Sequence, residues 1–218
     1  MVDKTLKGTP FFNFSAVIRL QGKLNLAALQ ASAAGIVHRH HILRTNFVEV
    51  NGRPVQRVTD LPFNMSLVDL TAAPEEHRID LSRKLAEQEA HYVFDISREL
   101  LLRVICFRMG EDDHRVALIM HHIVTDGWST GLFIRELTTL YAAYSTGAPS
   151  PLPPLPVQYS DFAVWERQQA NSSVVLQRRR YWLVVFPIPK NLNTAPAMEA
   201  KVMARRLSMP HIKWSVHG

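Results

Sequence analysis

The chain has 218 residues, enough for one large domain, and its 47% hydrophobic and 20% charged residues are ordinary for a globular protein. No apolar run approaches the roughly 20 residues that a membrane-spanning helix needs, and the N-terminus lacks the features of a secretory signal. The single cysteine, Cys106, excludes an internal disulfide and a cysteine-built zinc site, and its apolar neighbours indicate a buried thiol. We therefore expect a cytoplasmic protein with no membrane partner.

The net charge of +6 comes from the C-terminal part of the chain. From Glu166 onward there are nine Lys/Arg and two Asp/Glu, which leaves 16 basic and 17 acidic residues over positions 1–165. Arg178-Arg179-Arg180 is the densest basic cluster, and no basic strand with interleaved aromatic residues accompanies it. A solvated helix face explains this cluster more simply than phosphate binding, so we expect no nucleic-acid partner.

Strand, helix and hairpin signals alternate in the first half of the chain. Apolar runs that end in turn residues predict strands, and capping residues before periodic apolar positions predict helices. The predicted elements are a strand over Phe11–Leu20, a helix capped by Asn25, a hairpin of Thr45–Val50 and Val55–Val58 that turns at Asn51-Gly52, and a helix from Pro74 to about His91.

The second half begins with two apolar strands, Leu100–Met109 and Val116–Met120, joined by the polar turn Gly110–His114. Trp128–Tyr144 then predicts a helix, and five prolines between residues 149 and 156 predict a stiff, extended connector. Two more helices are predicted over Gln158–Gln169 and Gln177–Leu183, whereas the residues after Trp182 indicate no element. Antiparallel hairpins mixed with helices predict an α+β fold, an α/β sandwich.

Two adjacent histidines, His121 and His122, follow the second of these strands. Side chains alternate along a strand, so one histidine can be the chemical residue and the other a structural one. An imidazole at this position suits general-base or proton-shuttle chemistry, because its pKa lies near working pH. Gly127 permits a tight turn before the helix, whose N-terminus can stabilise negative charge. On the dipeptide alone, a core or turn role for both histidines stays open.

Other chemistries find less support in the sequence. The adjacent histidines lack the i, i+4 spacing of two metal ligands on one helix face, and no carboxylate motif completes a metal site. His38, His40 and His41 lie near the end of the first helix, where we interpret them as capping residues. There is no serine nucleophile elbow and no glycine-rich phosphate loop. Of the reaction types considered, direct attack of one substrate on another, positioned by a histidine, is the one that remains.

Three motifs in order favour the catalytic interpretation. His121-His122-Ile123-Val124-Thr125-Asp126-Gly127 resembles the His-His-x-x-x-Asp-Gly signature of nonribosomal peptide synthetase condensation domains. The segment Arg39–Phe47 is similar to that family's Arg-His-Glu-x-Leu-Arg-Thr-x-Phe motif, with His41 in place of Glu, and Tyr159–Trp165 looks like its Tyr-x-Asp-Phe-Ala-x-Trp motif. Phe94-Asp95 also fits the family, although Glu99-Leu100 stands where Gly-Pro is common. The resemblance covers about residues 10–182.

The resemblance implies a fold similar to chloramphenicol acetyltransferase, in which two α/β lobes enclose a tunnel. It implies that residues 1–182 are the N-terminal lobe, truncated at its front, and that residues 183–218 are a tail unlike the family. The implied reaction joins two thioester-bound substrates: an acceptor amine attacks a donor thioester. The resemblance also implies that the chain itself binds no cofactor, because donor and acceptor carrier proteins would deliver both substrates on phosphopantetheine. An adenylation domain would belong to the same assembly line.

Site residues carry over from the motifs by position. His122 would be the catalytic histidine, and His121 would be packed beside it. Asp126 would form a buried ion pair with Arg44, whose loss would cost about 3–5 kcal/mol. Gly127 would keep the backbone close to the tunnel.

The family's first motif and the motifs of its C-terminal lobe are missing from the sequence. A lobe without its partner lobe implies weak or absent condensation by this chain alone, together with self-association through the exposed face. Two alternatives remain. One is a related acyltransferase that esterifies a hydroxyl, and the other is a non-catalytic remnant that docks carrier proteins.

Overall fold

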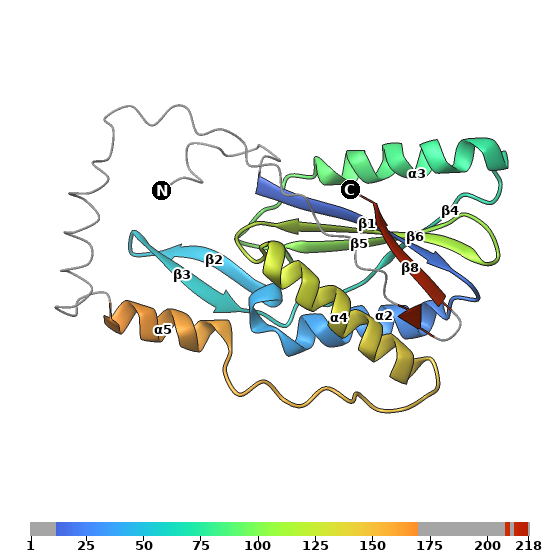
Figure 1. Ribbon diagram of the computed structural model, residues 1–218. Coiled ribbons are helices and arrows are strands. Elements are labelled where there is room, and N and C mark those ends of the chain that lie inside the picture. Colours follow the sequence, from blue (N-terminus) through green and yellow to red (C-terminus); the bar gives the residue numbers. More distant parts are fainter. Residues whose placement is uncertain (1–11, 170–207, 210–211, 218) are drawn as a thin grey trace, which may run out of the picture. The chain divides into compact units, whose positions relative to one another are not determined.

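The computed structural model describes residues 12–169, 208–209 and 212–217 (Figure 1). The chain divides into two units, one formed by residues 1–154 with 202–218 and the other by residues 155–201. A six-stranded sheet with the strand order β4-β5-β6-β1-β8-β7 forms the centre of the first unit. Its strands are β1 (Asn13–Gln21), β4 (Ser66–Asp69), β5 (Leu102–Arg108), β6 (Asp113–His121), β7 (Ser208–Met209) and β8 (Ile212–His217).

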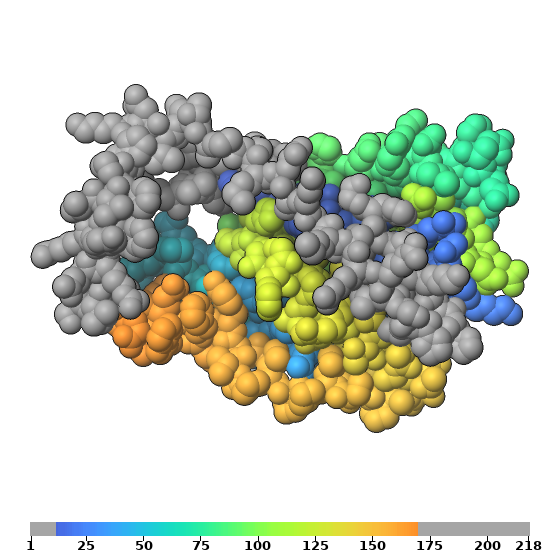
Figure 2. Space-filling model, viewed as in Figure 1, coloured from blue at the N-terminus to red at the C-terminus, as the bar shows by residue number. Residues whose placement is uncertain are grey.

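Helices cover both faces of this sheet. The helices α2 (Leu26–Arg39) and α4 (Gly127–Tyr144) pack against each other on one face, and α3 (Glu75–Ala90) lies on the other (Figure 1). The core between these layers contains Ile18, Leu29 and Leu118, each at most 1% exposed. On the face drawn in Figure 2, α4 and the connector that follows it lie at the surface. The predicted α/β sandwich is therefore confirmed.

Local sequence signals account for the confirmed elements. The Asn25 side chain accepts a hydrogen bond from the Ala28 backbone N–H and begins α2 as its cap. The predicted hairpin forms a separate two-stranded sheet of β2 (Thr45–Val50) and β3 (Arg53–Val58), and its turn residues have φ angles of 51° at Asn51 and 74° at Gly52. Both angles lie in the left-handed region that this turn requires.

The strand before the histidine pair begins earlier than the sequence pattern predicts. It starts at Asp113, inside the expected polar turn, and pairs antiparallel with both β1 and β5. Asp113 is held there by Arg19 of β1, whose Nε lies 2.9 Å from the carboxylate. Pairing with two neighbouring strands therefore extends β6 into residues that are polar in sequence.

The end of the chain contributes strands where the sequence indicates no element. The strand β8 pairs antiparallel with β1, from Val17 opposite His217 to Gln21 opposite Lys213, and β7 pairs with β8. The described end of the tail thus belongs to the same unit as the lobe. The predicted helix over Gln177–Leu183 lies outside the described residues.

The second unit contains α5 (Tyr159–Gln169), as predicted. Three aromatic side chains of the third motif follow one another along this helix. The ring centroids are 6.0 Å apart for Tyr159 and Phe162, and 5.7 Å apart for Phe162 and Trp165. The motif therefore forms a row of neighbouring aromatic rings within this unit.

The thiol of Cys106 lies in the core of the sheet. The residue is 0% exposed, and burial raises the pKa of Cys106 to about 12. A thiol with so high a pKa carries almost no thiolate near neutral pH, so it does not act as a nucleophile. The interpretation of a buried core thiol is confirmed. Among the described residues, no helix has the length and apolar character needed to cross a membrane.

A buried histidine at the start of β6 makes the stability of the fold depend on pH. His114 is 3% exposed, and its Nδ1 has no hydrogen-bond partner among the described residues. Burial lowers the pKa of His114, Arg108 lowers it further, and Asp113, Asp112 and Asp69 oppose the shift. Below pH ~6.5 the unfolded chain therefore binds a proton that the folded chain does not.

We expect the free energy of unfolding to fall as the pH drops below about 6.5, with a slope of up to about 1.4 kcal/mol per pH unit from this group. Urea unfolding of the parent and of His114→Leu at several pH values between 7.5 and 5 measures how the free energy of unfolding of each protein changes with pH. The leucine variant should lose less stability on acidification. Parallel pH curves for the two proteins would show that His114 does not contribute.

Candidate active site

The histidine pair lies where β6 ends and the chain turns toward α4. His121 is the last residue of β6, and the His122 N–H donates to the Phe12 carbonyl at 2.7 Å. The chain then turns, because the Val124 N–H donates back to the His121 carbonyl at 3.0 Å. Two main-chain bonds therefore fix the backbone on both sides of His122.

The imidazole of His122 is exposed to solvent. Its Nδ1 lies 3.4 Å from the Thr125 carbonyl oxygen, and its ring stands at an angle of 69° to the Phe14 ring with 6.3 Å between centroids. A carbonyl can only accept, so this contact favours the tautomer with the proton on Nδ1. Nε2, which has no hydrogen-bond partner among the described residues, is then the nitrogen that can accept a proton from a substrate.

The imidazole of His121 has different surroundings. It lies between two phenylalanine rings, with centroid distances of 6.0 Å to Phe12 and 6.3 Å to Phe94. Its Nδ1 accepts a hydrogen bond of 3.1 Å from the Ile123 N–H. The two histidines therefore have different surroundings: the His122 side chain is exposed, and the His121 ring is packed against phenylalanine rings.

Asp126 is the N-cap of α4. Its Oδ1 accepts hydrogen bonds from the Ser129 N–H at 2.7 Å and from the Ser129 hydroxyl at 2.6 Å. These bonds lower the pKa of the Asp126 carboxyl, the hydroxyl contributing most. Gly127 is the first residue of α4, and, apart from its chain neighbours and the backbone of its own helix, no described atom lies within 4 Å of the position that a Cβ would take there. The space beside this part of the turn is open.

The predicted ion pair between Asp126 and Arg44 is wrong. Arg44 donates from Nη1 to the Thr59 carbonyl at 3.1 Å and to Asp60 Oδ1 at 3.0 Å, so it joins the base of the β2–β3 hairpin to the segment after it. Asp126 instead binds Ser129 three residues later, a local capping bond that needs no distant partner. The carboxylate is exposed, so it does not require a cation to compensate burial.

Because Asp126 acts as a cap, its removal should cost much less than the loss of a buried ion pair. We expect Asp126→Ala to lower the free energy of unfolding by about 1 kcal/mol, within the range for helix caps, and Asp126→Asn to retain most of the stability. Urea unfolding of the two variants and the parent measures both values. A loss of about 3–5 kcal/mol in Asp126→Ala would instead indicate a buried ion pair.

Contacts of the buried Glu136 with Arg39 and His40 join the end of α2 to α4. The Glu136 carboxylate lies 2.7 Å from His40 Nε2 and 3.4 Å from Arg39 Nε, and Arg39 also donates from Nη1 to the Pro153 carbonyl at 2.5 Å. The backbone N–H of His40 donates to the Ile36 carbonyl at the C-terminus of α2. No local pattern in the sequence indicates the contact between its ring and Glu136, which lies 96 positions away.

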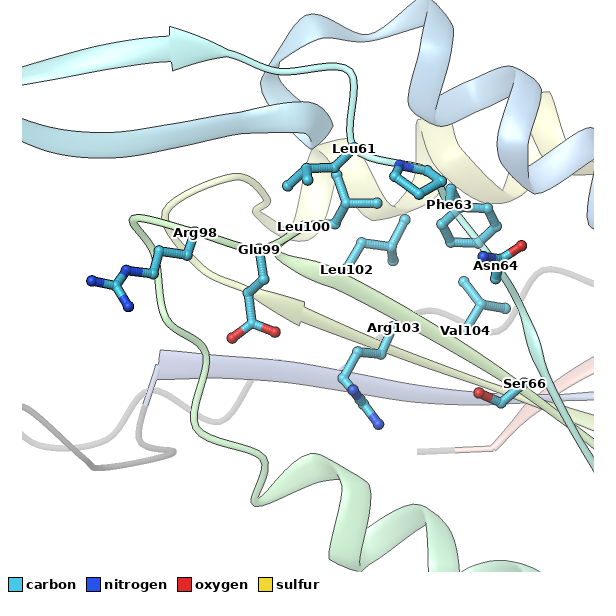
Figure 3. A pocket seen from close by; sticks show the side chains of 11 residues that line it. Leu61, Phe63, Asn64, Ser66, Arg98, Glu99, Leu100, Leu102, Arg103 and Val104 are labelled. Carbon is cyan, nitrogen blue, oxygen red and sulfur yellow. The ribbon is translucent and has the colours of Figure 1, made fainter.

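His122 lines neither of two cavities among the described residues of this unit. The larger, of about 370 Å³, lies between the segment before β4 and the start of β5. Figure 3 shows Leu61, Phe63 and Leu102 converging there, whereas Arg98 points away. The smaller, of about 90 Å³, lies between α2 and α4 and is lined by His40, Thr125 and apolar side chains. His122 is thus a surface group beside the small cavity, not inside it.

Solved structures share this arrangement. The starter condensation domain of the rhizomide synthetase RzmA has a TM-score of 0.77 at 17% identity, over 84% of this chain and 44% of that one. The X-domain from teicoplanin biosynthesis has a TM-score of 0.68 at 31% identity, over 78% of this chain and 37% of that one. The fold is therefore that of one lobe of the chloramphenicol acetyltransferase-like sandwich seen in condensation domains.

The sequence comparisons agree with the fold. The family model described as "Condensation domain" matches residues 1–213. The chondramide synthase cmdD of Chondromyces crocatus is 39% identical over 172 residues, which is 78% of this chain and 4% of that protein. The chain belongs to the condensation-domain family of nonribosomal peptide synthetases, a family of peptide-bond-forming domains. It spans a small fraction of the synthetases that it matches and less than half of the solved chains.

Proposed function

We propose that this lobe forms amide bonds between aminoacyl or peptidyl thioesters, with His122 as the group that takes the proton from the attacking amine. The observation that supports this most directly is the setting of the imidazole. It is exposed, its Nδ1 faces the Thr125 carbonyl, and its Nε2 is left as a base toward solvent. An imidazole with Nδ1 directed at a carbonyl is suited to receive a proton at Nε2.

The proposed step balances without a cofactor. The acceptor amine nitrogen attacks the donor thioester carbonyl, so that a C–N bond forms and the C–S bond breaks. The proton lost by the amine passes to Nε2 of His122 and then to the departing thiolate. The products are an amide on the acceptor carrier and a free phosphopantetheine thiol on the donor carrier.

The neighbouring residues support this group through the backbone. His121 anchors the turn, Asp126 caps α4, and Gly127 leaves open space beside the turn.

The proposed partners follow from the family. They are donor and acceptor carrier proteins that bear phosphopantetheine, the C-terminal lobe of a condensation domain, and an adenylation domain of the same assembly line. The relatives that carry matching sequence are large peptide synthetases, which supports this arrangement. The cytoplasm is the compartment that we propose.

A test supplies the lobe with the second lobe of a condensation domain and with two loaded carrier proteins. The acceptor carries either an amino acid or the matching hydroxy acid, and mass spectrometry of the acceptor carrier detects transfer. We expect transfer to the amine at a rate well above that to the hydroxyl. Preferential ester formation would assign the chain to hydroxyl acylation. Binding of both carriers without any transfer would leave only the docking function.

A further inference from the structure

His121 holds the active-site turn through a side-chain bond to the backbone. The Ile123 N–H donates to His121 Nδ1 at 3.1 Å, one residue beyond His122. An imidazole nitrogen accepts a hydrogen bond only when it carries no proton, so this bond requires the tautomer of His121 with its proton on Nε2. The His121 ring therefore adds a side-chain bond to the main-chain bonds that hold the turn around His122, and this bond depends on the orientation of the ring.

Phe94 is placed to fix that orientation. Its ring is perpendicular to the His121 ring, at 89° with 6.3 Å between centroids, and the residue is 8% exposed. Phe12 contacts the same imidazole from the segment that leads into β1, at a tilt of 44°. With a ring from each of two segments against it, the imidazole has little freedom to rotate.

Phe94 packs against Tyr92, whose own position is held by further contacts. The Tyr92 ring meets the Phe94 ring edge-on, at 79° and 5.1 Å, and the Tyr92 hydroxyl donates to Glu99 at 2.8 Å. The Arg103 guanidinium lies over the Tyr92 ring, 4.2 Å from its centroid, and pairs with Glu89 at 2.8 Å. The row of contacts thus runs from a charged pair on the α3 face of the sheet to the turn of the site.

We propose that Phe94 is a positioning residue of this site: its ring holds His121 in the rotamer that binds the Ile123 N–H, and the closed turn then presents His122. Phe94 acts through His121, and no contact joins it to His122 in the described structure. The effect of Phe94 on catalysis rests on the proposed role of His122. The effect of Phe94 on the His121 ring can be measured without any reaction.

Nuclear magnetic resonance of the isotopically labelled full chain tests the proposal without a reaction. In the parent protein we expect His121 as the Nε2–H tautomer, with a scalar coupling across the hydrogen bond between the Ile123 nitrogen and His121 Nδ1. In Phe94→Leu we expect both tautomers of His121 and about tenfold faster hydrogen exchange at the Ile123 amide, since one hydrogen bond is lost from the turn.

Phe107→Leu is the matched control, because Phe107 is also buried, at 1% exposure, and lies on β5. It should lower stability but leave the His121 tautomer and the Ile123 exchange rate unchanged. Equal Ile123 exchange in the two leucine variants would overturn the proposal. So would the absence of the coupling in the parent, a measurement that stands even if Phe94→Leu fails to fold. Loss of activity in His122→Ala tests the proposed reaction separately.

Discussion

Replacing His122 with alanine should lower the rate of amide formation by about 10²–10⁴-fold, the usual contribution of a positioned general base. The variant removes Nε2, the nitrogen that faces solvent, while the backbone of the turn keeps its bonds to Phe12 and His121. Folding should be almost unchanged, because the side chain is exposed and its hydrogen-bond contact is long, at 3.4 Å. Single-turnover rates with both carriers loaded, measured for the lobe completed by its second lobe, give the effect.

His77→Ala is the control for this experiment. His77 is also exposed and lies in the first turn of α3, on the opposite face of the sheet from α4. The His77→Ala variant should form the amide at the same rate as the parent protein. A similar loss of rate in both variants would indicate that the reaction does not depend on the imidazole at position 122.

Replacing Glu136 with alanine should produce a large loss of stability, about 3 kcal/mol in the free energy of unfolding. Glu136 is 5% exposed, and its removal leaves Arg39 and His40 partly buried without their shared carboxylate. Breaking a buried ion pair by deleting one partner typically costs about 3–5 kcal/mol, and the lower end fits because Arg39 and His40 retain some access to water. Urea unfolding at neutral pH measures the change.

Asp80→Ala serves as the comparison for Glu136. Asp80 pairs with Arg83 on α3 at 3.1 Å, and both side chains are more than 60% exposed. An exposed pair of this kind contributes well under 1 kcal/mol, so this variant should unfold almost as the parent does. Equal losses of unfolding free energy in the two variants would mean that the contacts of Glu136 with Arg39 and His40 do not stabilise the packing of α2 on α4.

The elements that could be predicted from sequence are those with local causes. Asn25 directly precedes α2 and caps it by accepting a hydrogen bond from the Ala28 N–H. Asn51-Gly52 adopts the positive φ angles that close the hairpin. Asp126 carried the same kind of local signal, since aspartate is a preferred residue directly before the first turn of a helix. The resemblance to the family's motif favoured a distant arginine instead, and the local bond is the one that forms.

The contacts that could not be predicted join residues far apart in sequence. The strand β8 has a weak pattern of its own and is defined by its pairing with β1. The bond between His40 and Glu136 depends on how α2 crosses α4. The contact of Phe94 with His121 depends on where the chain returns after α3. Such contacts follow from the packing of layers, which residue spacing alone does not encode.

The mass of the acceptor carrier protein, recorded after a single turnover with a loaded donor carrier, tests the role of His122 most directly. With the parent lobe completed by its partner lobe, the acceptor should gain the mass of the donor residue as an amide. With His122→Ala, the acceptor should keep its starting mass over the same time. Equal gains in both reactions would contradict the assignment of the proton transfer to this imidazole.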